Sequence, residues 1–354
     1  MNDQFPDPLR YSALGKKEIA SALDLLVESK VSEESKSKFL RALHQRGETA
    51  RELAGFAEIL LERAVQPEID RSHGTLLIEL CGTGGDRAGF LNISTAAMFV
   101  VAGAGAHVVK HGNRAVSSRC GSADVLEALG VSLHLKPASI GEVLERAGCV
   151  FLLASDFHPA VAAVAPLRRS LAAQGQMTIF NLLGPLLNPA KPDFQLTGIY
   201  RAEMLPLYAT AMGLLGRKRA WAVHGEGGAE GGGVDELSIT GSSRVVAVSE
   251  EDPILDDFVI RPDQLGFEPV TSTQSLLGGD ASANAGRIQE ILSGKEKSPA
   301  RDMIILNAAA ALHLAGKATT LLDAIALAAG SLDSGAAAES LSLLRDASQE
   351  ASLR

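Results

Sequence analysis

Apolar residues near the N-terminus recur at helical spacing. This spacing predicts helices at Lys16–Ser29 and Ser35–Gln45, because side chains three or four positions apart share one helix face. The apolar positions are Ile19, Leu23 and Leu26 in the first helix and Phe39, Leu40 and Leu43 in the second. No run typical of a strand precedes Thr75, so residues 1–74 are predicted to form a small all-helical domain.

From Leu76 onward, short apolar runs alternate with helical patterns. The predicted strands are Leu76–Cys81, Ala106–Lys110, Cys149–Ala154, Ala220–His224 and Arg244–Val248. Strands that alternate with helices are typical of a parallel sheet. The pattern predicts an α/β fold in which residues 75–354 form a larger domain around a mostly parallel central sheet. Ligands of such folds bind at the carboxyl ends of the strands.

Composition fits this two-domain interpretation. The chain has 354 residues, of which 46% are hydrophobic and 21% are charged, so it can bury a sizeable core. The stretch 88–109 carries no charge, but polar residues at one end and glycines at the other favour a loop, a buried helix and a turn over a membrane span. The three cysteines form no C-x-x-C pair, and no signal-peptide pattern opens the chain. We therefore expect a cytoplasmic protein.

The net charge of −9 is concentrated in one segment. Residues 225–260 hold nine acidic side chains and one basic side chain, Arg244. The chain has only 11 Phe, 3 Tyr and 1 Trp, and it lacks the basic face and the stacking surface of a nucleic-acid-binding protein. Small molecules are the expected ligands.

Two segments have the features of anion sites. The strand 76–81 leads into Gly82-Thr83-Gly84-Gly85-Asp86, where glycines let backbone amides face a phosphate. Ten residues after Gly82, Asn92-Ile93-Ser94-Thr95 opens an apolar helix, whose N-terminus favours an anion. Taken singly, the first segment could be an ordinary tight turn and the second an ordinary helix cap. Together they favour a ligand with two anionic groups.

A third segment, Lys110-His111-Gly112-Asn113-Arg114-Ala115-Val116-Ser117-Ser118, follows the next predicted strand. It combines two fixed cations, a histidine, an amide and two hydroxyls within nine residues. Lys110 can act as a point charge on phosphate and Arg114 as a two-pronged donor, whereas His111 alone would more often be structural.

The order of these motifs resembles the anthranilate phosphoribosyltransferase family. The resemblance continues through Gly121–Gly130, His158-Pro159-Ala160, Phe180–Pro189, Asp235-Glu236, Gly278-Gly279-Asp280 and Leu306–Ala310, and it covers nearly the whole chain. Members of that family transfer the phosphoribosyl group of phosphoribosyl pyrophosphate (PRPP) to the amine of anthranilate in tryptophan biosynthesis and release pyrophosphate. The resemblance implies a nucleoside phosphorylase-like fold, helices from 158–190 joined to the N-terminal domain, and a homodimer.

The resemblance also implies a PRPP site. Its residues would be Gly82, Gly85, Asp86, Phe90, Asn92, Ile93, Ser94, Thr95, Lys110, His111, Gly112, Asn113, Arg114, Ala115, Val116, Ser117, Ser118 and Ser122. The family commonly has Thr or Ser at the position of Phe90. The stretch 171–177 and the glycine-rich segment 225–233 are longer than usual.

Metal and acceptor residues follow from the same resemblance. Magnesium prefers carboxylates together with phosphate and water, and Asp235, Glu236 and Ser94 are the implied ligands of two Mg²⁺ ions per subunit. Without that context, an adjacent Asp-Glu pair in an acidic segment would be solvated surface. Gly82, Asn113, His158 and Arg168 are the implied anthranilate contacts, with Arg168 favoured over Arg169 as the partner of the carboxylate.

The expected mechanism depends on position and charge. The anthranilate amine is already neutral, so we assign no general base and expect Lys110, Asn113 and Arg168 to position the transition state. His111 and His158 remain as proton acceptors. Two alternatives are a pyrimidine nucleoside phosphorylase of the same fold, which would not need the metal acids, and a non-catalytic homologue that binds nucleic acid.

Overall fold

The computed structural model describes residues 5–115, 119–227, 232–268 and 270–354. Its centre is a seven-stranded sheet in the order β3-β2-β1-β4-β5-β6-β7. The strands are β1 (Leu77–Gly82), β2 (His107–Gly112), β3 (Cys149–Leu153), β4 (Phe194–Gly198), β5 (Arg219–Gly225), β6 (Ser243–Ser249) and β7 (Asp256–Ile260). β1 to β5 pair in parallel, whereas β6 and β7 are antiparallel additions at one edge.

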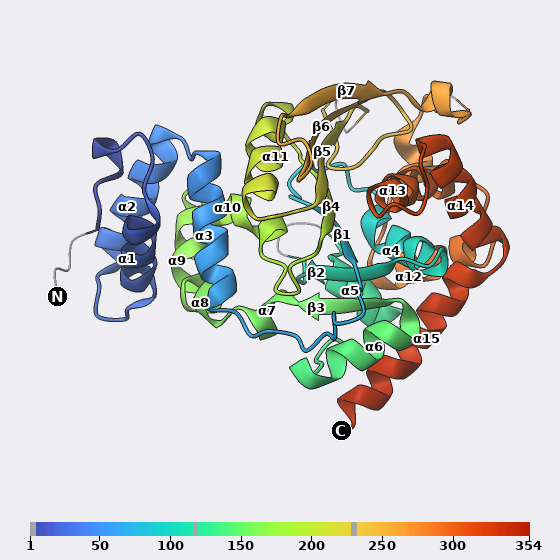
Figure 1. Cartoon of the computed structure of the whole chain (residues 1–354), viewed down its shortest axis with the longest axis horizontal. Coiled ribbons are helices and arrows are strands. Elements are labelled where there is room, and N and C mark those ends of the chain that lie inside the picture. The colour runs from blue at the N-terminus through green and yellow to red at the C-terminus, as the bar shows by residue number, and fades with distance from the viewer. Residues whose placement is uncertain (1–4, 116–118, 228–231, 269) are drawn as a thin grey trace.

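Helices cover the sheet and extend from one side of it. They are α1 (Lys16–Val27), α2 (Glu33–Arg46), α3 (Ala50–Glu62), α4 (Ile93–Gly103), α5 (Ser122–Ala128), α6 (Ile140–Ala147), α7 (Ala154–Phe157), α8 (Pro159–Ala163), α9 (Ala165–Ala173), α10 (Phe180–Leu183), α11 (Leu205–Leu214), α12 (Ala281–Leu292), α13 (Pro299–Leu314), α14 (Leu321–Asp333) and α15 (Ala336–Ser352). Figure 1 shows α11 beside one face of the sheet and α4, α13 and α14 beside the other. The α/β architecture and the helical N-terminus confirm the predicted fold class.

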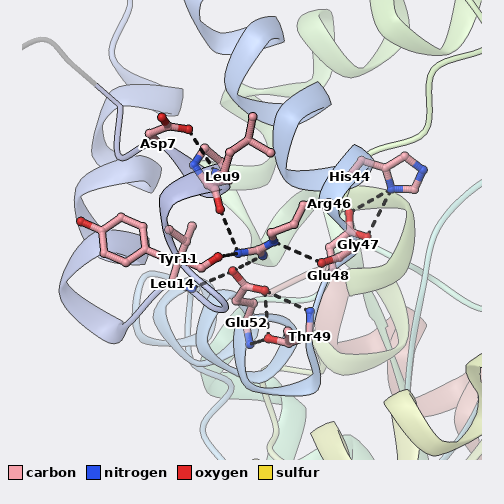
Figure 2. Close-up of polar contacts among 11 residues, drawn as sticks. Asp7, Leu9, Tyr11, Leu14, His44, Arg46, Gly47, Glu48, Thr49 and Glu52 are labelled. Atoms are coloured by element: carbon pink, nitrogen blue, oxygen red, sulfur yellow. Dashed lines mark hydrogen bonds and ion pairs between the residues drawn. The ribbon is translucent and has the colours of Figure 1, made fainter.

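The N-terminal helices are fixed by a buried carboxylate. Thr49 and Glu52 form a reciprocal capping box at the start of α3, and the second oxygen of Glu52 accepts the Leu14 N–H at 2.8 Å. The Arg46 guanidinium also donates to Glu52, as Figure 2 shows. Although burial opposes ionisation, the hydrogen bonds from Arg46, the Leu14 amide and Thr49 lower the pKa of Glu52. One side chain therefore connects the chain before α1, the end of α2 and the start of α3.

Two strands were absent from the sequence prediction. β4 carries Gln195 and Thr197 within its buried run, and these polar residues hide the apolar signal of a central strand. β7 lies at the sheet edge, where its acidic residues Asp256 and Asp257 are exposed. The expectation that Arg244–Val248 joins a parallel sheet is wrong, because β6 pairs antiparallel to β5, from Arg219 with Ser249 to Gly225 with Ser243.

The apolar interior consists of two clusters. One contains α4, α13 and one face of the sheet. The other joins α1, α2 and α3 to α9, α10, α11 and the opposite side of β5 and β6. The helical N-terminus thus shares a core with the sheet, and the domain boundary at residue 74 stays a prediction.

Within the described ranges, no single helix is both long and apolar enough to cross a membrane. The pair α14 and α15 meets that test of length and composition only jointly, with a bend of 64° between the two helices.

Candidate active site

The paired carboxyl ends of β1 and β4 lie directly against Asp235. A Cβ atom at Gly198 would lie 1.5 Å from the Asp235 carbonyl oxygen, and one at Gly82 would lie 2.3 Å from its Oδ2. Only glycine permits this approach. Residues that follow β5 are thereby brought against the ends of two other strands.

The segment Gly82–Asp86 forms an open loop over this edge. Gly84 and Gly85 have φ values of 67° and 89°, which glycine adopts without strain. The Gly84 N–H donates to Oδ2 of Asp235 at 2.6 Å, and the Asp235 N–H donates to Asp86 at 3.4 Å. The glycine loop and the acidic segment therefore hold each other in place.

The N-terminus of α4 lies beside the same carboxylates. Asn92 is the N-cap, yet its side chain makes no cap hydrogen bond and instead contacts the Cys120 carbonyl and Asn284. The Ser94 N–H donates to Oε1 of Glu236 at 3.2 Å. The helix end is thus directed toward an anionic side chain, as its dipole favours.

Asp235 and Glu236 occupy an environment that disfavours their charge. Burial raises the pKa of both carboxyls, and the neighbouring Asp86 raises them further. A bound cation would relieve this penalty. In the described part of the chain, no three His, Cys, Asp or Glu side chains form a preassembled metal cage. Two carboxylates and the Ser94 hydroxyl nevertheless fit Mg²⁺, which keeps water and phosphate as its other ligands.

Lys110 is buried beneath the carboxylates. Its Nζ donates to the Leu80 carbonyl at 2.6 Å and to the Ser94 hydroxyl at 3.1 Å. Burial lowers the pKa of Lys110, while Glu236 and Asp235 are among the groups that oppose this shift. Its ammonium group therefore already has two protein partners within the wall of the site.

A histidine near the end of β2, His111, lies beside His158, which stands between α7 and α8. The rings of His111 and His158 meet edge to face, with centroids 5.1 Å apart. His158 Nε2 donates to the Leu187 carbonyl at 2.7 Å, which leaves Nδ1 as an unpartnered acceptor, and His111 Nε2 is also buried without a partner. Burial lowers the pKa of His111 to about 3 and lowers that of His158, so both rings are neutral near pH 7.

The next segment, residues 112–115, turns toward α5. Asn113 and Arg114 are exposed, and the Arg114 guanidinium pairs with both oxygens of Glu127 at 2.8 and 2.9 Å. The Ala115 N–H donates to Asp124. At the start of α5, the Ser122 hydroxyl accepts a hydrogen bond from Thr95 at 3.1 Å. The predicted contacts Val116, Ser117 and Ser118 lie outside the described residues.

The tandem arginines on α9 differ in environment. Arg168 is half-buried, its guanidinium lies 5.7 Å from the centre of the Phe180 ring, and desolvation lowers its pKa. Its Nη2 donates to the Phe180 carbonyl at 3.4 Å. Arg169 is exposed. The helix thus directs one arginine inward and the other toward solvent.

The structure connects some of the predicted site residues by hydrogen bonds, whereas others contribute only their backbone. Hydrogen bonds join Asp235 to the glycine loop and Asp86, and join Glu236 to Ser94 and through it to Lys110; because Asp235 and Glu236 are adjacent, the two groups form one cluster. The side chains of Ile93 and Phe90 pack on the core, so their backbone is the part available to a ligand. The sequence analysis missed Glu79, which accepts the His111 N–H at 3.2 Å. Its signal was a charge inside the apolar run Leu77–Cys81.

Comparison with known proteins gives one consistent result. The helical bundle domain of a glycosyl transferase family matches residues 9–64, and the a/b domain of that family matches residues 74–338. Anthranilate phosphoribosyltransferase of Anaeromyxobacter dehalogenans is 44% identical over 328 residues, which are 93% of each chain.

Solved structures agree with the sequence relatives. Anthranilate phosphoribosyltransferase of Thermus thermophilus superposes with a TM-score of 0.86 at 38% identity, over 97% of this chain and all of that one. The Saccharomyces cerevisiae enzyme in complex with PRPP and Mg has a TM-score of 0.83 at 26% identity, over 95% of this chain and 94% of that one. A second structure of the yeast enzyme contains 4-fluoroanthranilate.

Proposed function

The chain belongs to the anthranilate phosphoribosyltransferase family, and we propose that it transfers the phosphoribosyl group of PRPP to the amine of anthranilate. The products are N-(5-phosphoribosyl)anthranilate and pyrophosphate. One observation carries the proposal: two anion-binding segments, Gly82–Asp86 and Asn92–Thr95, meet a half-buried acidic pair at a single sheet edge. A substrate with a phosphate at one end and a pyrophosphate at the other requires this combination.

We propose that PRPP binds along the sheet edge through the ends of β1 and β2. The glycine loop and the first turn of α4 would supply backbone N–H donors. The rest of the PRPP site would be lined by Gly112, Asn113, Ala115 and Ser122. Arg114 is hydrogen-bonded to Glu127, so it would contact the phosphate either in addition to Glu127 or after that ion pair breaks. Lys110 would act from beneath, because its charge lies close to Ser94 and Glu236.

Magnesium is the proposed metal, held by Asp235, Glu236 and Ser94. When bound, Mg²⁺ neutralises negative charge on the pyrophosphate. The two carboxylates are directed differently: Asp235 contacts the glycine loop, whereas Glu236 contacts the N-terminus of α4. This divergence supports the proposal of two ions per subunit.

Anthranilate is proposed to bind between Gly82, Asn113, His158 and Arg168. Its carboxylate needs a cation once it leaves water, and Arg168 is held in place by the Phe180 ring and carbonyl. The unprotonated ring nitrogen of His158 is an acceptor without a partner, which suits the N–H groups of an amine.

The residues of the chain would accelerate the reaction by placement and charge. The neutral aromatic amine attacks C1 of the ribose without prior deprotonation, and Asn113 and Arg168 hold it on that line. Lys110 stabilises the negative charge that develops on the departing pyrophosphate. Since burial lowers the pKa of His111 to about 3, His158, whose Nδ1 has no partner, is the better acceptor for the proton that the product amine releases.

We also propose a homodimeric, cytoplasmic protein. The exposed apolar side chains of Leu9 and Tyr11 on the N-terminal helical region support an interface there. The three cysteines are buried and unpaired, as expected in a reducing compartment. Light scattering of the purified protein tests the dimer.

An omission assay tests the proposed activity against the two alternatives. Anthranilate fluorescence should fall when both PRPP and Mg²⁺ are added, and it should stay constant when either one is left out. A pyrimidine nucleoside phosphorylase would instead cleave uridine or thymidine with inorganic phosphate and without metal. Binding of single-stranded RNA without any turnover would favour the non-catalytic alternative.

A further inference from the structure

The backbone ladder between β1 and β2 ends before the strands do. In these fully described strands, only Leu77 with His107 and Ile78 with Val108 are in register. By contrast, β1 pairs with β4 as far as Gly82, and β2 pairs with β3 as far as Gly112. β1 and β2 therefore separate toward their carboxyl ends, where the glycine loop and the segment Lys110–Asn113 begin.

Two side chains span this gap in place of ladder hydrogen bonds. Lys110 Nζ donates to the Leu80 carbonyl at 2.6 Å, and the His111 N–H donates to Oε1 of Glu79 at 3.2 Å. The Lys110 side chain also contacts Ser94 at the start of α4, whereas Glu79 faces Arg217, which follows α11, so the two bridges lie on opposite faces of the sheet (Figure 1). Each bridge joins one strand to the backbone of the other.

Glu79 is costly to bury, and core packing does not account for it. Its side chain is 1% exposed and its Oε2 has no hydrogen-bond partner. Burial raises the pKa of Glu79 to about 7, although the Arg217 charge opposes that shift. Arg217 is also buried and leaves Nη2 unpartnered. In either protonation state, Glu79 retains an oxygen that accepts the His111 N–H.

We propose that Glu79 is a positioning residue, whose side-chain oxygen sets the separation between the glycine loop after β1 and the Lys110–Asn113 segment after β2. This inference rests on the proposed function, because those two segments are the walls between which PRPP and anthranilate would meet. A shift of about 1 Å between reacting groups can reduce turnover on the order of 100-fold. The positioning requires a Glu79 oxygen that accepts the His111 N–H, and it does not require a negative charge on Glu79.

Three variants isolate that oxygen. Arg217→Met alone, Arg217→Met with Glu79→Gln, and Arg217→Met with Glu79→Leu all lack the buried guanidinium, so none carries an unpaired cation at that position. The Gln variant keeps a carbonyl acceptor of nearly the same length, whereas the Leu variant has none. Steady-state kinetics with PRPP and anthranilate and hydrogen exchange of the His111 amide in the substrate-free protein provide two independent measurements.

The Gln variant should retain kcat within about threefold of Arg217→Met. The Leu variant should lose about 30-fold or more in kcat, with each KM changed less than about fivefold, and its His111 amide should exchange at least about tenfold faster. Equal kcat in the Gln and Leu variants, or equal amide exchange, would overturn the positioning role. Inactivity of the wild-type chain would instead contradict the proposed function, and the exchange measurement would still test Glu79.

Discussion

Individual glycines determine where the acidic pair lies. Asp235 follows a glycine-rich segment and would be solvated surface in isolation, yet the absence of a side chain at Gly82 and Gly198 lets it lie directly against the paired ends of β1 and β4. The sequence motif identified Gly82 as part of the site, although it placed in a loop a residue that ends β1. It did not indicate that Gly198 performs the same task, because that contact joins segments distant in the chain.

Gly198→Ala should therefore displace Asp235. The added methyl group would overlap the Asp235 carbonyl oxygen, and backbone cannot yield as a flexible side chain can. We expect kcat/KM to fall on the order of 100-fold, together with a lower thermal midpoint. Gly330→Ala in α14 is the matched control, since nothing lies within 4 Å of its added carbon. Normal activity of Gly198→Ala would show that Asp235 does not need its present position.

Arg168→Ala should weaken anthranilate binding selectively. Loss of a partly screened carboxylate contact should raise the anthranilate KM about tenfold, which corresponds to about 1.4 kcal/mol, and leave the PRPP KM near its starting value. Arg169→Ala is the control, because that side chain is exposed. A larger anthranilate effect from Arg169 would reverse the assignment within α9.

The double variant Asp235→Asn with Glu236→Gln should lose activity while it keeps the fold. Loss of the metal ligands should reduce kcat on the order of 100-fold or more, since Mg²⁺ contributes several kcal/mol to such reactions. The raised carboxyl pKa values mean that the folded, metal-free protein binds protons more tightly than the unfolded chain. Their contribution to stability is complete below the ordinary carboxyl pKa and is lost as pH rises through the raised values.

Thermal melts in EDTA test this sign. The wild-type midpoint should fall more steeply between pH 5 and pH 8 than that of the double variant, and Mg²⁺ at pH 8 should raise only the wild-type midpoint. Parallel pH profiles for the two proteins would show that these carboxyls are not perturbed by burial.

At the scale of elements, the sequence predicted what local periodicity encodes. The helices at 16–27 and 33–46 and five strands were anticipated within a few residues. Strand β4 was not predicted because its polar residues Gln195 and Thr197 interrupt the apolar run. Their buried hydrogen bonds, to each other and from Gln195 to the Pro185 carbonyl, exist only in the tertiary structure. The antiparallel direction of β6 depends on its tertiary pairing with β5, which an apolar run does not specify.

The start of α3 offers a test at this scale. Glu52→Gln keeps the capping box but removes the charge that holds Arg46, so the free energy of unfolding should fall by about 2 kcal/mol in urea denaturation. Glu58→Gln lies in the same helix and loses only an exposed ion pair with Lys16, so its effect on the free energy of unfolding should be much smaller. Equal losses would contradict the role of Glu52 as a buried connector.

At the scale of the whole molecule, the motifs identified the site's components before their arrangement was known. Residues 82–86 and 92–95 were assigned to PRPP and residues 235–236 to its metal, from their chemistry and their resemblance to a family, and the structure brings these segments into hydrogen-bond contact. The burial of Lys110 and the bridge from Glu79 could not be predicted, because both depend on how far β1 and β2 separate.

The most direct test of the proposed activity is the identity and ratio of its products. Mass spectrometry of a reaction containing PRPP, anthranilate and Mg²⁺ should detect N-(5-phosphoribosyl)anthranilate and pyrophosphate in equal amounts, with neither formed when anthranilate is left out. Release of pyrophosphate at the same rate without anthranilate, or consumption of PRPP with no phosphoribosylated anthranilate, would contradict the account.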